Sequence, residues 1–151
     1  MDIFETIKHD HRQVEELFSE IEKTKDSKKL SSLFHKIYQE LNLHAKVEEL
    51  TFYPSMREYE ETEELLEEAE EEHNQVKILL EELQSLSPTS SEFKEKIGKL
   101  KTAVQHHVQE EEEEVFPKVR QSMSEEELDE LSQEFEETKS KLQKEMAGTK
   151  K

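Results

Sequence analysis

Two segments of the chain carry a histidine that is followed four residues later by a glutamate: His44 with Glu48, and His107 with Glu111. Residues four positions apart lie one turn apart on the same face of a helix. Imidazole nitrogens and carboxylate oxygens are ligands that divalent transition metals accept in proteins. Each segment therefore offers a metal ion two ligands from one helical face, although a single such pair is more often simply solvated.

The two pairs belong to an internal repeat. In each half of the chain a His-x-Gln-Val sequence precedes the pair, beginning at His11 and at His73. In each half a proline also follows the paired histidine at the same interval, Pro54 in the first and Pro117 in the second. Similar composition alone explains these shared details poorly. We therefore interpret the chain as two related helical hairpins, each with His followed by His-x-x-x-Glu.

The elements that must position these residues are helices. Apolar residues recur at intervals of three and four in four long segments, which is typical of helices with one apolar face. The four stripes comprise Phe4, Ile7, Val14, Phe18 and Ile21; Leu30, Phe34, Ile37 and Leu41; Leu66, Ala69, Val76, Leu80 and Leu83; and Phe93, Ile97, Leu100 and Val104. A fifth stripe comprises Leu128, Leu131, Phe135 and Leu142. Short connections favour antiparallel neighbours, so we predict an all-α fold: an up-down-up-down four-helix bundle with an additional C-terminal helix.

Capping residues mark several helix boundaries. Asp26 follows the first stripe and is placed to cap the second helix. Two pairs have the spacing of a capping box, in which a hydroxyl and a glutamate three residues later satisfy each other's backbone N–H groups: Thr89 with Glu92, and Ser124 with Glu127. These pairs predict the starts of the fourth and fifth helices.

The expected organisation is a bundle over residues 1–121, an appended helix over residues 122–146 and a frayed tail over residues 147–151. Pro54 and Pro117 each remove a helix hydrogen bond, so kinks or early helix ends are expected near them. Whether the fifth helix packs on its own bundle or on a second copy, in a homodimer, is left open by the sequence.

Extending the stripes through their polar gaps places four histidines and two glutamates on the core-facing side. These six are His11, His44, Glu48, His73, His107 and Glu111, whereas His9, His35 and His106 fall off the stripes. A rise of about 1.5 Å per residue brings all six to a similar level of the bundle. An uncompensated buried carboxylate costs several kcal/mol, a large share of a stability of about 5–15 kcal/mol. One or two divalent transition-metal ions would compensate the burial.

The composition limits the classes of partner. The 151 residues have a formal net charge of −18 and include no cysteine. The negative charge argues against nucleic acid and against an anionic membrane surface. The lack of cysteine excludes thiolate metal sites, iron–sulfur clusters and disulfides. No secretory signal or membrane span is recognisable, so a cytoplasmic location is expected.

In combination these motifs resemble the hemerythrin-like, or HHE cation-binding, domains over residues 3 to about 120. The resemblance rests on His11-x-x-Val, on His44-x-x-x-Glu-x5-Pro54, on Glu-Glu-His73-x-x-Val, and on His106-His107-Val-x-Glu-Glu-Glu with Val-Phe-Pro117. Each fragment is common, but the combination is specific. Ferritin-like di-iron bundles are less similar, because they use Glu-x-x-His motifs and more carboxylates.

The resemblance implies a non-haem centre of two iron ions joined by an oxo or hydroxo group. The implied terminal ligands are His11, His44, His73 and His107, and the implied bridging ligands are Glu48 and Glu111. Within the glutamate run, Glu110 after His106 is the shifted alternative to Glu111.

Lys77 stands where the oxygen-carrying hemerythrins have a further histidine, four residues after the position of His73. An ammonium group must lose a proton before it can bind a metal, and the reference pKa of lysine is about 10.4. The six remaining side chains and a bridging oxygen leave two positions open on an octahedral metal pair, whereas a fifth histidine would leave one. The resemblance therefore favours binding or sensing of O2, peroxide or nitric oxide over reversible O2 carriage.

Three classes of function stay open. The leading one is a metal-binding protein with a small ligand rather than an enzyme. The first alternative is a di-iron oxidase or peroxidase, or an iron-handling or repair protein. The second is a metal-free helical interaction protein, or one whose buried histidines act as a pH switch.

Two further features follow from residues near the predicted ligands. Tyr53, just beyond Glu48, is expected to close the dry end of the bundle, with iron ligation or quenching of oxidants as the alternative. The acidic runs at residues 60–72 and 110–114 are expected to be solvated helix faces, apart from Glu111.

Overall fold

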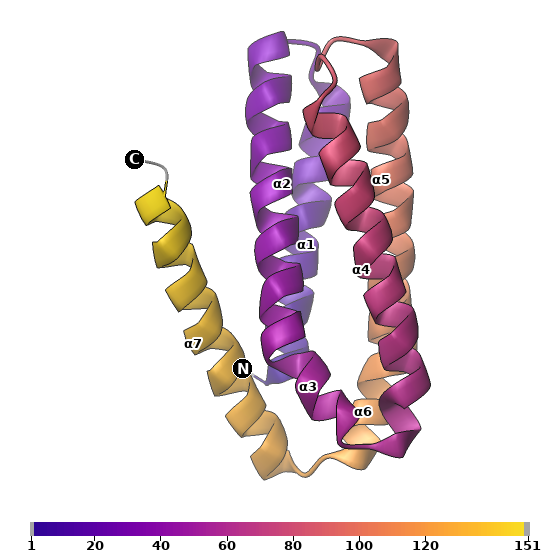
Figure 1. The fold of residues 1–151 in the computed structure, drawn as a ribbon, viewed down its shortest axis with the longest axis vertical. Helices are drawn as coiled ribbons and strands as arrows, with labels where there is room; N and C mark the ends of the chain where they lie inside the picture. Colours follow the sequence, from indigo (N-terminus) through magenta and orange to yellow (C-terminus); the bar gives the residue numbers. More distant parts are fainter. Residues whose placement is uncertain (1, 150–151) are drawn as a thin grey trace.

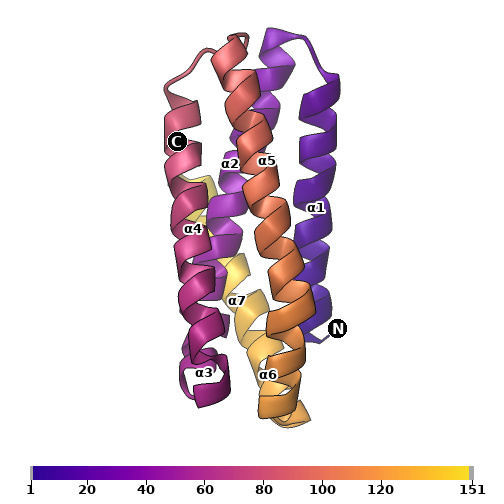
Figure 2. The ribbon, with the colours of Figure 1, turned by 90° about the vertical axis from the view of Figure 1, so that its right-hand side faces the viewer.

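A computed structural model describes residues 2–149 of the chain, and side chains up to residue 146. Four long helices run antiparallel to their neighbours (Figures 1 and 2): α1 (Ile3–Lys23), α2 (Ser27–Leu50), α4 (Glu63–Gln84) and α5 (Ser91–Glu110). A further helix, α7 (Glu125–Thr149), contacts α1 and α2 from outside the bundle (Figure 1). The predicted four-helix bundle with an additional C-terminal helix is confirmed.

Shorter helical elements follow the second long helix of each hairpin. These elements are α3 (Phe52–Arg57), the 3-10 turn η1 (Glu60–Thr62), the π-helical turn η2 (Glu111–Val115) and α6 (Phe116–Ser122). Proline has no N–H to donate to the carbonyl four residues earlier. That carbonyl belongs to Leu50 for Pro54 and to Glu113 for Pro117. The irregularities expected near the two prolines are present at these places: α2 ends at Leu50, and Glu113 lies in the π-helical turn.

The predicted caps are correct at two of three helix starts. The Asp26 carboxylate caps α2. At the start of α7, the Glu127 N–H donates to Ser124 Oγ at 3.2 Å and the Ser124 N–H donates to Glu127 Oε1 at 3.4 Å. The prediction for Thr89 was wrong: Ser90 caps α5. The reason is that the Ser90 N–H closes the preceding turn, so the helix begins one residue later.

The core consists of two apolar clusters along the bundle axis. One lies at the α3–α6 end and includes Phe52, and the other lies toward the hairpin turns and includes Phe18. On α1, Ile7 belongs to the first cluster and Val14 to the second. The buried polar residue His11 lies between them. A layer of polar side chains therefore separates the two halves of the core.

Helix α7 extends the cluster at the α3–α6 end. Leu128, Leu131 and Phe135 are buried there, so the fifth helix packs on its own bundle. The backbone of α7 is helical to Thr149, and residues 150–151 of the predicted frayed tail lie outside the described residues. None of the helices in the described part of the chain has the length and apolar character needed to cross a membrane.

Candidate metal centre

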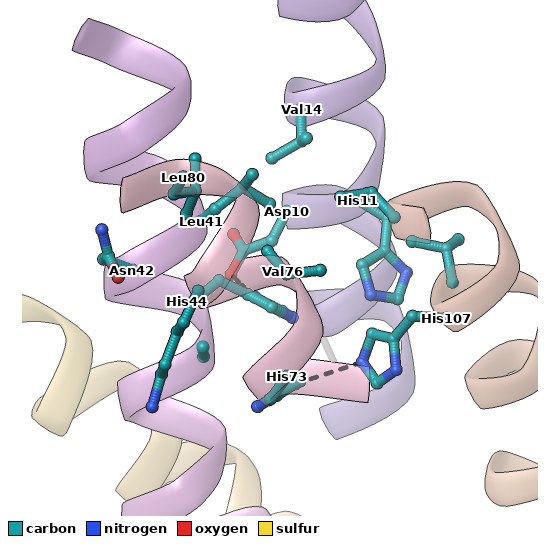
Figure 3. Close-up of a pocket in the computed structure, with 14 residues that line it drawn as sticks. Asp10, His11, Val14, Leu41, Asn42, His44, His73, Val76, Leu80 and His107 are labelled. Carbon is teal, nitrogen blue, oxygen red and sulfur yellow. Dashed lines mark hydrogen bonds and ion pairs between the residues drawn. The ribbon is translucent and has the colours of Figure 1, made fainter. Parts of the chain in front are cut away.

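Each long helix carries one core-facing histidine at the same level of the bundle. His11 lies on α1, His44 on α2, His73 on α4 and His107 on α5. Their side chains are between 4% and 11% exposed. Figure 3 shows these histidines among the residues that line one cavity. Four imidazoles are thus shielded from solvent and close to one another.

Glu111 lies between histidines of the two hairpins. Its Oε1 is 3.1 Å from His11 Nε2, and its Oε2 is 3.3 Å from His107 Nε2. The side chain is 1% exposed. Glu111 is the first residue of the π-helical turn, and such widened turns are frequent at functional sites. The carboxylate therefore contacts one histidine from each half of the repeat.

Glu48 has the corresponding place in the first hairpin. Its Oε1 is 3.1 Å from His44 Nε2 and 3.3 Å from His73 Nε2, and the side chain is fully buried. The structure thus brings together all six residues that the sequence singled out. We call them the His–Glu cluster: His11, His44, Glu48, His73, His107 and Glu111. Their role as metal ligands stays a prediction.

Several buried atoms of the His–Glu cluster make no hydrogen bond within the described part of the chain. They are Nε2 of His11, Nε2 of His44, both carboxylate oxygens of Glu48, and Oε1 of Glu111. An unpaired buried polar atom costs about 1–3 kcal/mol, and more when it is charged. With metal–ligand bonds of about 2.1 Å, two ligands at right angles lie about 3 Å apart. The 3.1–3.3 Å spacings between cluster atoms fit that separation.

The nitrogen and oxygen atoms of the cluster that could bind a metal form two groups, within each of which they lie no more than 4.8 Å apart. One group comprises His11, His44 and Glu111, and the other comprises Glu48, His73 and His107. Each glutamate also reaches a histidine of the other group. We refer to the His11–His44 half and the His73–His107 half of the cluster. The arrangement is suited to two neighbouring ions with shared carboxylates.

A second set of carboxylates surrounds the cluster. Each accepts a hydrogen bond from Nδ1 of a histidine on the next helix: Asp10 from His44 (2.9 Å), Glu49 from His73 (3.1 Å), Glu72 from His107 (2.8 Å) and Glu112 from His11 (2.7 Å). These outer carboxylates form a closed circuit around the bundle, from α1 to α2, α4 and α5, and from the adjoining turn η2 back to α1. Such a bond fixes the orientation of the ring and leaves Nε2 available for a metal.

The outer carboxylates were not predicted from the sequence, and two of them fall within the acidic runs that were expected to be solvated. The repeat does contain a pattern from which the outer carboxylates could have been predicted. An acidic residue precedes both His11 and His73, and another follows both Glu48 and Glu111. Neighbouring residues on a helix point about 100° apart. A residue next to a core-facing ligand can therefore be directed at the adjoining helix.

The carboxylates change the protonation of the buried histidines. Burial by itself lowers the pKa of His44, but Glu48 and Asp10 outweigh that effect and raise the pKa to about 10. Burial also opposes the charged form of His107, yet Glu111 raises its pKa well above the usual value. Without a metal ion, these imidazoles hold protons that a bound metal would displace.

Tyr53 reaches the cluster from α3. Its hydroxyl lies 3.0 Å from His73 Nε2 and donates to Glu111 Oε2 at 3.4 Å. The side chain is buried and belongs to the apolar cluster at the α3–α6 end. Burial, together with Glu48 and Glu111, raises the pKa of Tyr53 well above its usual value, so the hydroxyl keeps its proton. Tyr53 thus closes this end of the bundle, as expected, and also places an O–H group beside the cluster.

A small cavity of about 40 Å³ adjoins all four histidines on the side toward the hairpin turns (Figure 3). Its apolar lining includes Val14, Val76 and Leu80. Lys77 also lines it, and the Lys77 ammonium lies 3.3 and 3.4 Å from the two carboxylate oxygens of Glu49. The lysine therefore pairs with an outer carboxylate.

The histidines that fall off the apolar stripes lie outside the cluster. His9 and His35 are exposed. His106 is 70% exposed and pairs with Glu72 at 3.2 Å and with Glu110 at 3.4 Å. The shifted alternative, Glu110, is thus on the outside of the bundle, and Glu111 occupies the place between the core histidines.

Comparisons with known proteins agree with these features. The sequence profile of the family described as hemerythrin HHE cation binding domain matches residues 2–119. An uncharacterized hemerythrin-like protein of Schizosaccharomyces pombe is 31% identical over 139 residues, which are 91% of this chain and 68% of that protein. A protein named DNA nickase from a Nostoc strain is 35% identical over 98% of this chain, but the chain spans only 42% of its length.

The fold also occurs in a solved structure. The crystal structure of a hemerythrin HHE cation-binding domain-containing protein from Mycobacterium kansasii superposes with a TM-score of 0.82 over 93% of this chain and 86% of that chain. The identity is 23%, so this likeness concerns the fold. The match of the family profile over most of the chain settles the membership: this chain belongs to the hemerythrin HHE cation-binding domain family.

Proposed function

We propose that this chain is a non-haem di-iron protein that binds or senses a small ligand such as O2, nitric oxide or peroxide. The observation that carries the proposal is the set of buried nitrogen and oxygen atoms in the His–Glu cluster that lack hydrogen bonds. In a metal-free interaction protein or a pH switch, these atoms would have ion-pair contacts of 3.1–3.3 Å but no hydrogen bonds of good geometry. Membership of a cation-binding family supports a metal at this place, and four imidazoles with two carboxylates are compatible with iron.

In this proposal, His11 and His44 would hold one ion, His73 and His107 would hold the other, and the two buried glutamates would serve both. The iron pair, when bound, supplies redox chemistry and open coordination positions. The chain itself orients the imidazole rings through the outer carboxylates. Its apolar clusters keep water away from both ends of the centre. The Tyr53 hydroxyl holds a proton within reach of Glu111.

The cavity limits the size of the ligand. A single water needs at least about 10–15 Å³ of such space, so a cavity of about 40 Å³ admits a molecule of two or three heavy atoms. Lys77 at its wall is engaged by Glu49 and supplies no fifth imidazole. Two open positions therefore favour binding or sensing over reversible O2 carriage.

A second candidate is a di-iron peroxidase or oxidase, and Tyr53 favours it. The buried Tyr53 hydroxyl keeps its proton and is a preorganised hydrogen-bond donor, which would stabilise negative charge that develops on a reacting ligand. Its 3.0 Å distance from His73 Nε2 would let it donate a hydrogen bond to a ligand held on this side of the cluster. Simple ligand binding has no need of such a donor.

The two candidates are separated by adding O2, nitric oxide or peroxide to protein loaded anaerobically with Fe(II), while the optical spectrum is followed. A binding or sensing protein ends as one stable oxidised or liganded form, whereas an oxidase or peroxidase consumes many equivalents. Glu111→Ala serves as the control without a paired site and should give neither the spectrum of the two-iron centre nor repeated consumption of oxidant. The absence of any spectral change with all three ligands would contradict the proposal.

DNA cleavage, which the name of the Nostoc relative implies for that protein, is not proposed for this chain. A net charge of −18 opposes contact with phosphates. More than half of the relative also lies outside the matched segment.

A further inference from the structure

One lysine connects helix α7 to the His–Glu cluster. Lys139 Nζ lies 2.5 Å from Asp10 Oδ1, and the other oxygen of Asp10 accepts the hydrogen bond from His44 Nδ1. Asp10 is 4% exposed and Lys139 is 20% exposed. The pair is therefore largely shielded from water, and salt screens it less than an ion pair on the surface. Helix α7 thus supplies the countercharge for the carboxylate that orients His44.

Phe135 brings the same face of α7 against His44. The two ring centroids are 6.1 Å apart with an interplanar angle of 65°, and Phe135 is fully buried. Phe135 and Lys139 are four residues apart, so they lie one above the other on the helix. With 11% of its side chain exposed, His44 is the most accessible histidine of the cluster even with α7 in place. One face of α7 therefore contacts both His44 and Asp10.

The cations at two other outer carboxylates come from within the bundle. Arg12 on α1 donates to Glu112 at 2.9 Å, and Lys77 on α4 donates to Glu49 at 3.3 Å. Lys139 instead belongs to α7, which lies beyond the segment that matches the family. The countercharge that supports His44 is thus supplied by the appended helix.

We propose that Lys139 is a positioning residue for His44. It holds Asp10 in place, Asp10 keeps His44 Nε2 turned toward the cluster, and the ion in the His11–His44 half depends on α7 for its retention. This inference rests on the proposed two-iron site. Loss of a carboxylate that supports a metal-bound histidine typically weakens metal binding about 10–100-fold. Loss of the Lys139 charge should likewise weaken the binding of the ion in the His11–His44 half. It should leave the binding of the other ion unchanged.

The test compares three variants of the full chain after anaerobic loading with Fe(II). Lys139→Met removes the charge and keeps the length of the side chain, and Lys139→Arg restores the charge. Lys141→Met is the matched control, because Lys141 is exposed on the same helix. Each protein is challenged with an iron chelator, and iron per chain is followed over time by mass spectrometry. Circular dichroism verifies the helix content.

The expected result is biphasic loss in Lys139→Met. One iron leaves about tenfold faster than in the parent chain, within the range for such support, and the second leaves at the parent rate. Lys139→Arg and Lys141→Met should release both ions at the parent rates. The one-iron form of Lys139→Met, treated with nitric oxide, should share its optical spectrum with His44→Ala rather than with His73→Ala.

Combining Asp10→Asn with Lys139→Met sharpens the result. Because both changes act on the same hydrogen bond, the double variant should release iron no faster than Asp10→Asn alone. Parent-like release from Lys139→Met, or equal acceleration of both ions, would overturn the role of Lys139. A parent chain that never holds two irons would instead refute the proposed function, so the two failures are distinguishable.

Discussion

The two halves of the His–Glu cluster share the same kinds of ligand but differ in what supports them. In the His11–His44 half, Asp10 is buried and its countercharge, Lys139, comes from the appended helix. In the His73–His107 half, Glu49 and Lys77 are 35% and 45% exposed. Solvent and salt weaken an exposed pair far more than a buried one. The carboxylate that supports His44 is therefore held by tertiary packing, and the carboxylate that supports His73 is more open to water.

A second difference between the halves is the hydroxyl group beside His73. Tyr53 precedes Pro54 in the first hairpin, and Phe116 precedes Pro117 in the second. The phenylalanine has no group to donate. The repeat thus duplicates the predicted ligands and the outer carboxylates, while the proton donor and the α7 contact each occur in one copy. A nearly symmetric ligand set is placed in an asymmetric environment.

The largest effect should come from removing what the halves share. Glu111→Ala takes a ligand from both ions and leaves His11 Nε2 and His107 Nε2 without their partner. We expect at most one iron per chain by mass spectrometry and a smaller rise of the unfolding temperature with iron than in the parent chain. His106→Ala, which changes an exposed residue beside His107, should keep two irons. Two irons retained in Glu111→Ala would contradict a bridging role.

Tyr53→Phe tests the difference at His73. The variant should still bind two irons, because the ring keeps its packing. Its turnover of peroxide should fall about tenfold or more, since one preorganised hydrogen-bond donor typically contributes about 10²–10³-fold. Tyr38→Phe is the matched control, because the Tyr38 hydroxyl bonds to Glu81 on the exposed side of the bundle. Equal rates in Tyr53→Phe and the parent chain would refute the role of the Tyr53 hydroxyl as a donor.

Asp10→Asn and Glu49→Gln compare the two outer carboxylates with isosteric changes. Competition with a chelator should show a loss of iron affinity in the upper part of the 10–100-fold range for Asp10→Asn and a smaller loss for Glu49→Gln. The reason is that water can replace the lost charge at the half-exposed Glu49 and has little access to Asp10. Equal losses would show that the two halves are supported equally.

The smallest effect concerns pH and the metal-free protein. The pKa of His44 is raised to about 10, and the pKa values of His11 and His73 are raised as well. The protonated imidazoles then contribute their full stabilisation at any pH below about 6.5, which is the pKa of histidine in the unfolded chain. This contribution is lost as the pH rises through the higher pKa that the histidines have in the folded chain. The unfolding temperature of the metal-free protein should therefore fall by a few degrees between about pH 7 and pH 10.

Iron binding should show the opposite trend, because metals displace these protons. Affinity measured by competition should rise from about pH 6 to about pH 8. An affinity that falls over this range, or a metal-free protein whose unfolding temperature rises with pH, would be inconsistent with protonated cluster histidines.

The six cluster residues could be predicted because helical periodicity alone determines which residues face the core. His11, Val14 and Phe18 share one stripe, and the rise per residue sets their level. The outer carboxylates depend on something else: which helices are neighbours and how each is rotated. Asp10 and Glu72 therefore stand in the sequence like any other acidic residues on a helix.

The contact between α7 and the cluster depends on packing between distant segments. Nothing in the spacing of Lys139 relates it to Asp10, and the fifth stripe predicted a helix without its docking site. The π-helical turn is a similar case: Pro117 predicted an irregularity, but the sequence did not specify a widened turn that begins at Glu111. Local sequence patterns thus predicted the helices and their core-facing residues. The outer carboxylates, the α7 contact and the widened turn depend on tertiary packing.

The central claim is that a pair of metal ions compensates the burial of imidazoles and carboxylates in the bundle. The most direct test is the iron content of protein loaded and purified without oxygen, measured by mass spectrometry together with the unfolding temperature. The claim predicts two irons per chain and a higher unfolding temperature than that of the metal-free form. A chain that retains no metal and unfolds at the same temperature with and without iron would contradict it.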